Sequence, residues 1–379
     1  MLSLPIESVQ VMKTLDGFLK PWWQSLENPQ EVQEAVLRRL LLGYKQTKYG
    51  AKHSADKISS TEQFRVSFPI ITYEDLKPSI TTVMEGDFET LLPEPPIEWA
   101  MTRGTTGESK FVPITKTDLA QRVTCGPRAL LSYIYRSQSY NTLNGWDLNL
   151  NFPSLVGKKP THTGEITYGY SSGIYAKHNA EEARIKMVPE QDEIDALGGG
   201  ITSKDWENRF DLTYEKARDK NVTMVIGVIQ SMIQFASYLK KWKGIYPKDL
   251  WNIDVLVCTS LADIHTKHKL ALKGLYGDAA VTELYGATEG LYAQQLDAQP
   301  YVVPNYDTYF FEVEAGGRVK MLYELKTGQH GSLIISSCLF PRYKIGDLIR
   351  CMGKNYYCII GRDRRFTLTK HLLSRLLDF

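Results

Sequence analysis

The sequence predicts an α/β protein that ends in a β-rich part, and three observations support this class. Predicted helices and strands alternate between residues 204 and 276, and Val222–Val228 is an apolar, β-branched run typical of a buried parallel strand. After residue 305, short predicted strands follow one another with turns between them. We therefore expect a largely parallel sheet with covering helices, followed by an antiparallel or barrel-like module.

The N-terminal half is expected to begin with helices. Residues 30–47 carry apolar side chains at helical spacing, after a proline placed where a first helical turn tolerates it. Residues 66–82 read as a short apolar run followed by a helix start, and 118–136 as a helix interrupted by a glycine–proline pair. Residues 150–200 are rich in glycine, serine, threonine and tyrosine, which predicts loops and short strands that line a pocket.

The central unit alternates most clearly. A polar helix is expected at 204–220, a strand at 222–228, a helix at 229–242, a second strand at 254–258 and a helix at 261–276. Such an order is that of βαβ units, whose strands run parallel.

The predicted secondary structure changes to strands and turns in the C-terminal part of the chain. Ala315-Gly316-Gly317 separates two extended runs, 309–314 and 318–325, which predicts a hairpin. Further short strands are expected at 333–337, 348–351 and 356–360.

Composition narrows the functional classes. Lysine plus arginine number 45 and aspartate plus glutamate 43, giving a net charge of +2 over 379 residues. This near balance is unlike the clustered basic excess of a dedicated nucleic-acid binder. Hydrophobic residues at 43% and charged residues at 23% are those of a globular chain rather than a disordered one.

The cysteines and the apolar segments bear on the compartment. The five cysteines contain no pair at CxxC spacing, which argues against a disulfide framework or a structural zinc site. The N-terminus lacks a secretory pattern, and the apolar segments are shorter than the ~18 residues that span a bilayer. We expect a soluble cytoplasmic protein that binds neither membrane nor nucleic acid; its oligomeric state stays open.

The most informative segment is Thr102-Arg103-Gly104-Thr105-Thr106-Gly107-Glu108-Ser109-Lys110. Its glycines let the backbone approach an anion, its N–H groups and hydroxyls can donate to phosphate oxygens, and Lys110 supplies positive charge. The spacing is not that of the P-loop of kinases and GTPases. Taken alone, the segment is equally compatible with a polar surface loop.

A second segment is Glu283-Leu284-Tyr285-Gly286-Ala287-Thr288-Glu289-Gly290. An aromatic ring can stack on a base, a threonine hydroxyl can hold a phosphate, and a carboxylate can bind Mg²⁺, a cation that prefers oxygen ligands. Taken alone, it is equally a turn between a strand and a helix.

Two shorter segments follow, Tyr343-Lys344-Ile345-Gly346-Asp347-Leu348 and Gly361-Arg362-Asp363-Arg364. Asp347 can accept hydrogen bonds from ribose hydroxyls, and Arg362 can add a hydrogen bond or a charge to the same nucleotide.

Together and in this order, the four segments resemble the adenylate-forming superfamily of acyl-CoA synthetases, peptide-synthetase adenylation domains and firefly luciferase. Within it, the chain is most similar to the auxin-responsive acyl acid amido synthetases of plants and their microbial relatives. Three further features carry this closer resemblance: Pro69-Ile70-Ile71-Thr72-Tyr73-Glu74-Asp75-Leu76-Lys77-Pro78, Pro304-Asn305 ahead of 309–312, and Tyr323-Glu324-Leu325. The resemblance spans about residues 65–366.

The resemblance implies the large N-terminal domain of an adenylate-forming enzyme, with ATP and Mg²⁺ as cofactors. It assigns catalytic roles to Lys110, Thr288 and Glu289, with Glu289 as the metal ligand. The implied nucleotide-binding residues are Thr102, Gly104, Thr105, Thr106, Gly107, Lys110, Tyr285, Gly286, Ala287, Thr288, Asp347 and Arg362. The implied acyl-binding residues are Tyr170, Val228, Cys258, Thr259 and Ser260.

The same resemblance suggests specific roles for these residues. Thr105, Thr106 and Lys110 are expected to hold the β- and γ-phosphates, and Thr288 the α-phosphate. Tyr285 is expected to stack on adenine, while Asp347 and Arg362 fix the ribose. The sequence departs from the superfamily pattern at Arg103, Glu108-Ser109 and Lys344 without removing a loop glycine, Thr288, Glu289 or Asp347.

The expected organisation has four parts: an N-terminal helical segment at 1–64, an α/β adenylation core at 65–305, a β-rich subdomain ending at a hinge at 306–364, and a short tail at 365–379. In the superfamily the hinge leads into a small C-terminal domain, and the tail is too short to form one.

The expected reaction adenylates an organic acid and transfers the acyl group to an amine, an amino acid by resemblance, to form an amide. Two alternatives stay open: an acid–thiol ligase that makes an acyl-CoA, and a nucleotide- or acyl-binding protein without full turnover because the small domain is missing.

Two other features receive structural interpretations. His265 and His268 lie three residues apart beside Asp263, and we expect a solvated helix surface there rather than a metal site. Cys258 falls on a predicted buried strand without a cationic neighbour in sequence, so that we interpret it as a core thiol.

Overall fold

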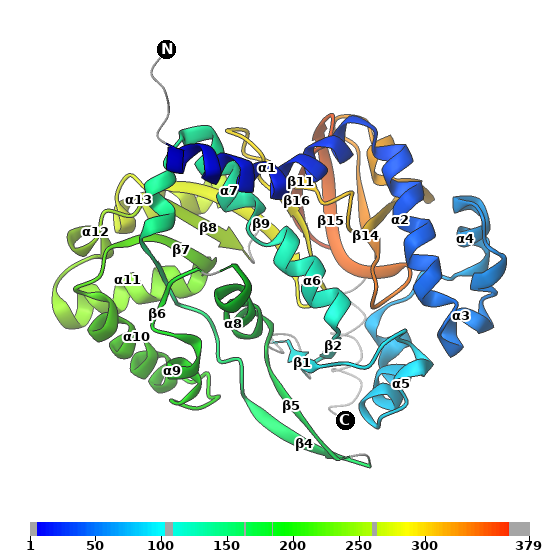
Figure 1. The fold of residues 1–379 in the computed structure, drawn as a ribbon, viewed down its shortest axis with the longest axis horizontal. Coiled ribbons are helices and arrows are strands. Elements are labelled where there is room, and N and C mark those ends of the chain that lie inside the picture. Colours follow the sequence, from blue (N-terminus) through cyan, green and yellow to red (C-terminus); the bar gives the residue numbers. More distant parts are fainter. Residues whose placement is uncertain (1–5, 103–108, 163, 184, 260–263, 364–379) are drawn as a thin grey trace, which may run out of the picture.

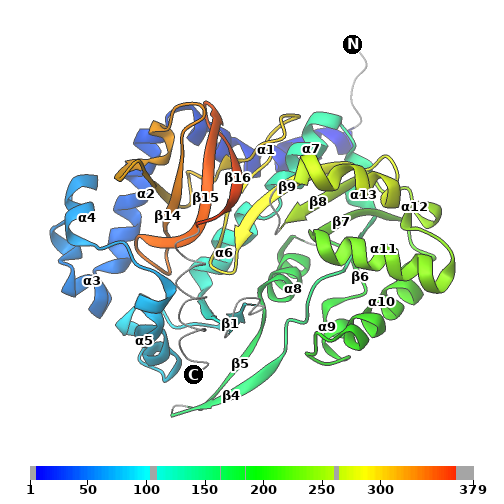
Figure 2. The same cartoon turned by 180° about the vertical axis from the view of Figure 1, so that it is seen from behind.

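The computed structural model describes the chain except residues 1–5, 103–108, 163, 184, 260–263 and 364–379. Its described strands form three sheets, with helices packed around them (Figure 1). The helices within residues 29–84 and the five-stranded antiparallel sheet lie on one side of the molecule and the largely parallel sheet on the other, as Figure 2 shows from behind.

The largest sheet has seven strands in the order β11-β10-β9-β8-β7-β3-β6. Its strands are β3 (Trp146–Leu148), β6 (Met187–Val188), β7 (Val222–Val228), β8 (Val255–Thr259), β9 (Ala280–Ala287), β10 (Gly290–Gln294) and β11 (Val303–Pro304). The five strands from β6 to β9 in this order run parallel, whereas β10 and β11 are antiparallel additions. The predicted strand at 222–228 is confirmed to the residue, and the one at 254–258 is shifted by one.

Helices cover both faces of this sheet. On one face lie α10 (Ser203–Ala217), α11 (Ile229–Lys243) and α13 (Lys269–Tyr276), with α9 (Gln191–Asp195), α12 (Pro247–Leu250) and the π-helical turn η4 (Ile264–His268) nearby. On the other lie α1 (Ile6–Glu27) and α7 (Arg128–Ser137). The α/β class and its βαβ units are thereby confirmed.

A four-stranded sheet in the order β2-β1-β5-β4 lies at the bottom of the view in Figure 1. It contains β1 (Glu98–Met101), β2 (Phe111–Ile114), β4 (Gly157–Thr161) and β5 (Gly164–Tyr170). The β4–β5 ribbon extends away from the rest of the molecule in Figure 1.

The expectation of loops and short strands over 150–200 is wrong for α8 (Ser171–Ala183). The segment packs so closely that a side chain at Gly173 would lie 2.1 Å from the carbonyl oxygen of Phe152. Tertiary contacts therefore set its conformation, where a composition of small and polar residues hid the helical period.

The five-stranded sheet has the order β13-β12-β14-β15-β16, with all neighbours antiparallel. Its strands are β12 (Phe310–Ala315), β13 (Arg318–Met321), β14 (His330–Ser336), β15 (Tyr343–Gly353) and β16 (Tyr356–Arg362). The predicted hairpin is confirmed: Gly316 and Gly317 have φ of 59° and 74°, the left-handed values that a tight two-residue turn requires. Among the described strands this is an open sheet rather than a closed barrel.

The remaining described helices are α2 (Pro29–Tyr44), α3 (Lys48–Lys52), α4 (Thr61–Ser67), α5 (Tyr73–Met84), α6 (Lys116–Cys125) and the short turns η1 (Ala55–Lys57), η2 (Phe88–Thr90), η3 (Tyr140–Asn144) and η5 (Leu322–Glu324). The predicted break between two helices falls at Gly126-Pro127, between α6 and α7. Among the helices that the structure describes, each is too short or too polar to traverse a bilayer.

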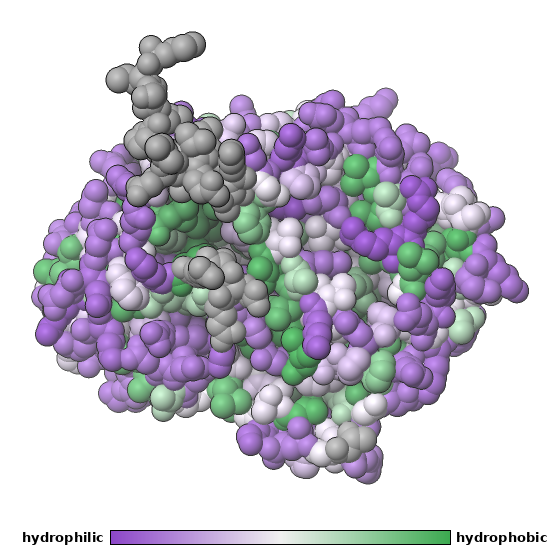
Figure 3. All heavy atoms as spheres, in the orientation of Figure 1, coloured by the Kyte–Doolittle hydropathy of each residue, from purple (hydrophilic) through white to green (hydrophobic). Residues whose placement is uncertain are grey.

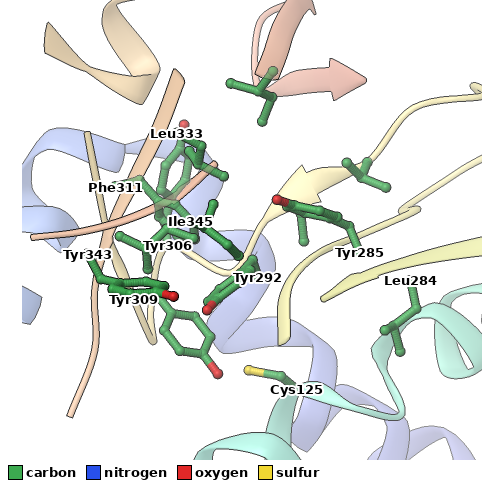
Figure 4. Packing of buried hydrophobic residues seen from close by; sticks show 14 of the residues in the cluster. Cys125, Leu284, Tyr285, Tyr292, Tyr306, Tyr309, Phe311, Leu333, Tyr343 and Ile345 are labelled. Carbon is green, nitrogen blue, oxygen red and sulfur yellow. The ribbon is translucent and has the colours of Figure 1, made fainter. Parts of the chain in front are cut away.

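A tyrosine-rich core joins the seven-stranded and five-stranded sheets. Figure 4 shows Tyr285 and Tyr292 on one side and Tyr309, Phe311 and Tyr343 on the other. On the molecular surface, hydrophobic residues gather near the middle of one face, within a mostly hydrophilic periphery (Figure 3). Because Tyr285 and Tyr343 both belong to the tyrosine-rich core, the predicted nucleotide segments at 283–290 and 343–348 lie at the junction of the two sheets.

Candidate functional site

The two ends of the predicted phosphate loop are held together at the edge of the four-stranded sheet. β1 and β2 pair with Met101 opposite Phe111. Just beyond, the Thr102 N–H donates to the Lys110 carbonyl, and the Lys110 N–H donates to Thr102 Oγ1, each at 2.9 Å. The other predicted loop residues, Gly104, Thr105, Thr106 and Gly107, lie outside the described residues.

The second segment forms a hairpin. Ala287 of β9 pairs with Gly290 of β10, so that Thr288 and Glu289 make a two-residue turn between strands. This differs from the strand-to-helix turn considered as the alternative. A side chain at Gly286 would come within 2.7 Å of the neighbouring strand, which explains the glycine at this position.

The buried Arg122 side chain contacts the backbone of this turn. Arg122 Nη2 donates to the Thr288 carbonyl at 2.8 Å, and Arg122 Nε donates to Asp118 Oδ2 at 2.8 Å. The guanidinium lies 4.1 Å from the centre of the Tyr175 ring. Burial raises the pKa of Asp118, although Arg122 opposes that shift. The pair stabilises the backbone of the residue predicted to bind the α-phosphate.

Glu289, the predicted metal ligand, is only 7% exposed. Its Oε1 accepts a 2.8 Å hydrogen bond from the Tyr343 hydroxyl. Burial, followed by the charge of Glu289, raises the pKa of Tyr343 well above its ordinary value, so that the hydroxyl stays protonated and donates. A carboxylate oriented by one hydrogen bond retains lone pairs for a hard cation.

Asp347 connects the third and fourth segments to the second. It lies opposite Arg362 in the β15–β16 register, and Arg362 Nη1 donates to its Oδ1 at 2.5 Å. The Tyr285 hydroxyl donates to Asp347 Oδ2 at 2.8 Å. Burial, followed by the Asp347 charge, raises the pKa of Tyr285 well above its ordinary value. The structure thus brings together Tyr285, Asp347 and Arg362, three of the residues predicted to bind the nucleotide.

No cluster of three histidine, cysteine or carboxylate side chains suited to a metal occurs within the described residues. Mg²⁺ is commonly bound by one or two carboxylates together with substrate phosphates rather than by a closed protein cage. Glu289 is the carboxylate for which the family resemblance predicts this role.

The structure places the predicted acyl-binding residues that it describes in different parts of the core. Tyr170 and Val228 share one buried cluster with Phe152, and Thr259 lies opposite Val228 in the β7–β8 register. Cys258 packs in a different cluster, with its Sγ 4.0 Å from Met232 Sδ. Ser260 lies outside the described residues. Cys258 is fully buried, which confirms the interpretation as a core thiol.

The expectation of a solvated surface is wrong for His265. Its side chain is 9% exposed, and its Nε2 lies 3.7 Å from Glu283 Oε2. Burial lowers the pKa of His265, and burial raises the pKa of Glu283 to about 7. The turn η4 folds back onto β9, a tertiary contact that local sequence does not reveal.

Sequence reasoning missed Arg122 altogether. It also assigned no role to Tyr343, although this tyrosine stands inside a recognised segment beside Lys344, or to Tyr73, which lies in the 69–78 segment. For Arg122 the only signal is an Asp–Arg pair at i, i+4 spacing on α6.

Comparison with known proteins places the chain in a family. Residues 20–249 match the model of the GH3 family N-terminal domain, which is more than half of the chain. The chain belongs to the GH3 family. The predicted resemblance is thereby confirmed at the level of this family.

Curated GH3 relatives match over shorter stretches. Indole-3-acetic acid-amido synthetase GH3.2 of Arabidopsis thaliana is 37% identical over 97 residues, covering 25% of this chain and 18% of that protein. Jasmonoyl–L-amino acid synthetase JAR6 of Nicotiana attenuata is 30% identical over 160 residues, covering 38% of this chain and 28% of that protein. The matched stretches therefore span less than a third of these relatives.

Solved structures share the fold over most of the chain. The AtGH3.15 acyl acid amido synthetase in complex with 2,4-DB superposes with a TM-score of 0.72 at 16% identity, covering 92% of this chain and 70% of that one. A 2-hydroxyisobutyryl-CoA ligase superposes with a TM-score of 0.60 at 17% identity, covering 87% and 67%. At these identities the likeness establishes the large-domain fold alone.

Proposed function

We propose that this GH3 protein is an ATP- and Mg²⁺-dependent ligase that adenylates an organic acid and transfers the acyl group to an amine, with an amino acid as the acceptor. The observation that carries the proposal is the hydrogen-bonded convergence of Tyr285, Asp347 and Arg362 beside the Thr288-Glu289 turn. Family membership supports it, because the named relatives are amido synthetases.

In the first step, a carboxylate oxygen of the acid bonds to the α-phosphorus of ATP. The bond from that phosphorus to the oxygen bridging the β-phosphate breaks, and pyrophosphate leaves. In the second step, the amine nitrogen bonds to the acyl carbon, the bond to the AMP oxygen breaks, and the amine proton passes to solvent.

The protein's task in the first step is alignment and charge neutralisation. We assign Lys110, with Thr105 and Thr106, to the β- and γ-phosphates and Thr288 to the α-phosphate. Glu289 would hold Mg²⁺, which when bound neutralises phosphate charge. Tyr170, Val228 and Thr259 remain the proposed acyl-binding residues.

Asp347 is suited to the ribose because a carboxylate has about four acceptor sites. Tyr285 and Arg362 occupy two of them, one on each oxygen. Two sites remain for the two ribose hydroxyls, while the two protein donors fix the orientation of the carboxylate. With its hydroxyl directed at Asp347, Tyr285 is proposed to offer its ring to adenine.

The proposed organisation follows the sequence: a helical segment at 1–64, an adenylation core at 65–305 and a β-rich subdomain at 306–364 that ends at a hinge. The test is ATP–pyrophosphate exchange across a panel of carboxylic acids, followed by product identification with amino acids or CoA. Acid-dependent exchange with amide formation supports the proposal, whereas a thioester product would favour the acid–thiol ligase, whose fold the chain shares.

A further inference from the structure

The segment 69–78, which has no role in the site as described so far, contacts two of the nucleotide motifs at once. Its Thr72 precedes α5 in an extended conformation, and the Asp75 carboxylate accepts from the Thr72 N–H at 2.8 Å. This capping box fixes the backbone where the segment enters the helix. The two residues on either side of Thr72 are therefore held in place.

Tyr73, on one side, contacts the two residues at the end of the phosphate loop, Lys110 and Phe111. Its hydroxyl accepts from the Phe111 N–H at 2.9 Å and lies 3.2 Å from the Phe111 carbonyl, to which it donates. β2 is the edge strand of its sheet, so that these backbone groups face outward from the ladder. The Lys110 ammonium lies 4.8 Å from the centre of the Tyr73 ring, within range of a cation–π contact.

Ile71, on the other side, forms a parallel β-bridge with Tyr343 of β15, the strand that carries the third motif. The Ile71 N–H donates to the Arg342 carbonyl at 3.1 Å, and the Lys344 N–H donates to the Ile71 carbonyl at 2.7 Å. Between these residues stands Tyr343, whose hydroxyl donates to Glu289. Three consecutive residues thus link the phosphate loop, the hairpin turn and the β15 strand.

We propose that Tyr73 is a positioning residue that sets the location of Lys110 relative to Glu289 and Thr288. Its ring holds the Lys110 ammonium, and its hydroxyl fixes the adjoining peptide of Phe111. The phosphate-directed cation is thereby preorganised before ATP arrives, which avoids the cost of ordering a flexible lysine on binding. This inference rests on the proposed function, in which Lys110 contacts the β- and γ-phosphates.

The test is a double-mutant cycle on ATP binding to the 379-residue chain, with Tyr73→Phe, Lys110→Met and the double variant. Tyr73→Phe keeps the ring but removes both hydrogen bonds to Phe111, and we expect the ATP dissociation constant to rise roughly 5- to 30-fold. In the Lys110→Met background the same substitution should change ATP affinity less than twofold, because its effect acts through the lysine.

The matched control is Tyr276→Phe, which removes a buried hydroxyl that donates to the Met232 carbonyl at 2.7 Å, in a different core cluster from Tyr73, Tyr285 and Tyr343. It should lower stability as Tyr73→Phe does, without changing ATP affinity. Additive effects in the cycle, or equal ATP affinity of Tyr73→Phe and the parent, would overturn the positioning role while leaving the proposed function intact. A parent chain that binds no ATP would overturn both.

Discussion

Replacement of Asp347 by alanine should weaken ATP binding while the fold persists. The substitution removes the acceptor of two hydrogen bonds, one from the Tyr285 hydroxyl and one from Arg362, and the two sites proposed for the ribose. Hydrogen bonds to a charged group contribute about 1.5–3 kcal/mol, so that the dissociation constant for ATP should rise roughly ten- to hundredfold.

Asp347→Ala should also lower the free energy of unfolding, for a different reason. The Tyr285 hydroxyl is buried and would lose its acceptor, which costs about 1–3 kcal/mol. The ion pair adds little, since the Arg362 side chain is 58% exposed and solvent screens it. Chemical unfolding and isothermal titration with ATP separate the two effects.

Asp297→Ala provides the control for this prediction, because Asp297 accepts from the Tyr356 hydroxyl at 2.5 Å near the other end of β16. This variant should lose stability without losing ATP affinity. If the folded Asp347→Ala variant binds ATP as tightly as the parent, Asp347 does not belong to the nucleotide site.

Three further predictions concern buried charges. Glu289→Gln, which keeps an acceptor for Tyr343, should reduce Mg²⁺-dependent adenylation far more than metal-free ATP binding; an unchanged Mg²⁺ titration would refute the metal role. Burial raises the pKa of Glu283 to about 7 in the folded chain. The folded state therefore keeps the proton longer than the unfolded state, and the free energy of unfolding falls as the pH rises from the pKa of the unfolded chain toward 7. Glu283→Gln should therefore stabilise the protein above pH 7, by up to about 3 kcal/mol, and leave stability at pH 4 nearly unchanged; parallel unfolding curves of parent and variant against pH would refute this. The three guanidinium nitrogens of Arg209 are buried and have no hydrogen-bond partner among the residues that the structure describes. Arg209→Met should therefore raise the free energy of unfolding by roughly 1 kcal/mol after loss of the contact with Trp206, and a destabilised variant would contradict that account.

The sequence predicts those parts of the fold that local patterns determine. β7 is recovered to the residue because its β-branched run ends where the helical pattern of α11 begins. The β12–β13 hairpin is recovered because two consecutive glycines supply the positive φ of its turn.

The predictions that were wrong concern segments whose structure depends on contacts with distant parts of the chain. α8 is hidden by small polar residues and is fixed by packing against the backbone near Phe152. The burial of His265 arises because the turn η4 folds onto Glu283 of β9.

The candidate site shows the same division. The motif residues Tyr285, Asp347 and Arg362 could be named from the chain, because their order and spacing carry the family resemblance. The residues that hold the motifs, Arg122 and Tyr73, act on groups that lie 166 and 38 positions away in the chain. No local pattern encodes such pairings.

The central claim is that this chain activates a carboxylate as an acyl-adenylate. Acid-dependent exchange of labelled pyrophosphate into ATP tests it most directly, because exchange requires reversible formation of the adenylate and no acceptor amine. We predict exchange that depends on an added carboxylic acid and on Mg²⁺, and that falls sharply in Glu289→Gln. ATP binding without exchange, across a broad panel of acids and with Mg²⁺ present, would contradict the claim and leave a nucleotide-binding protein.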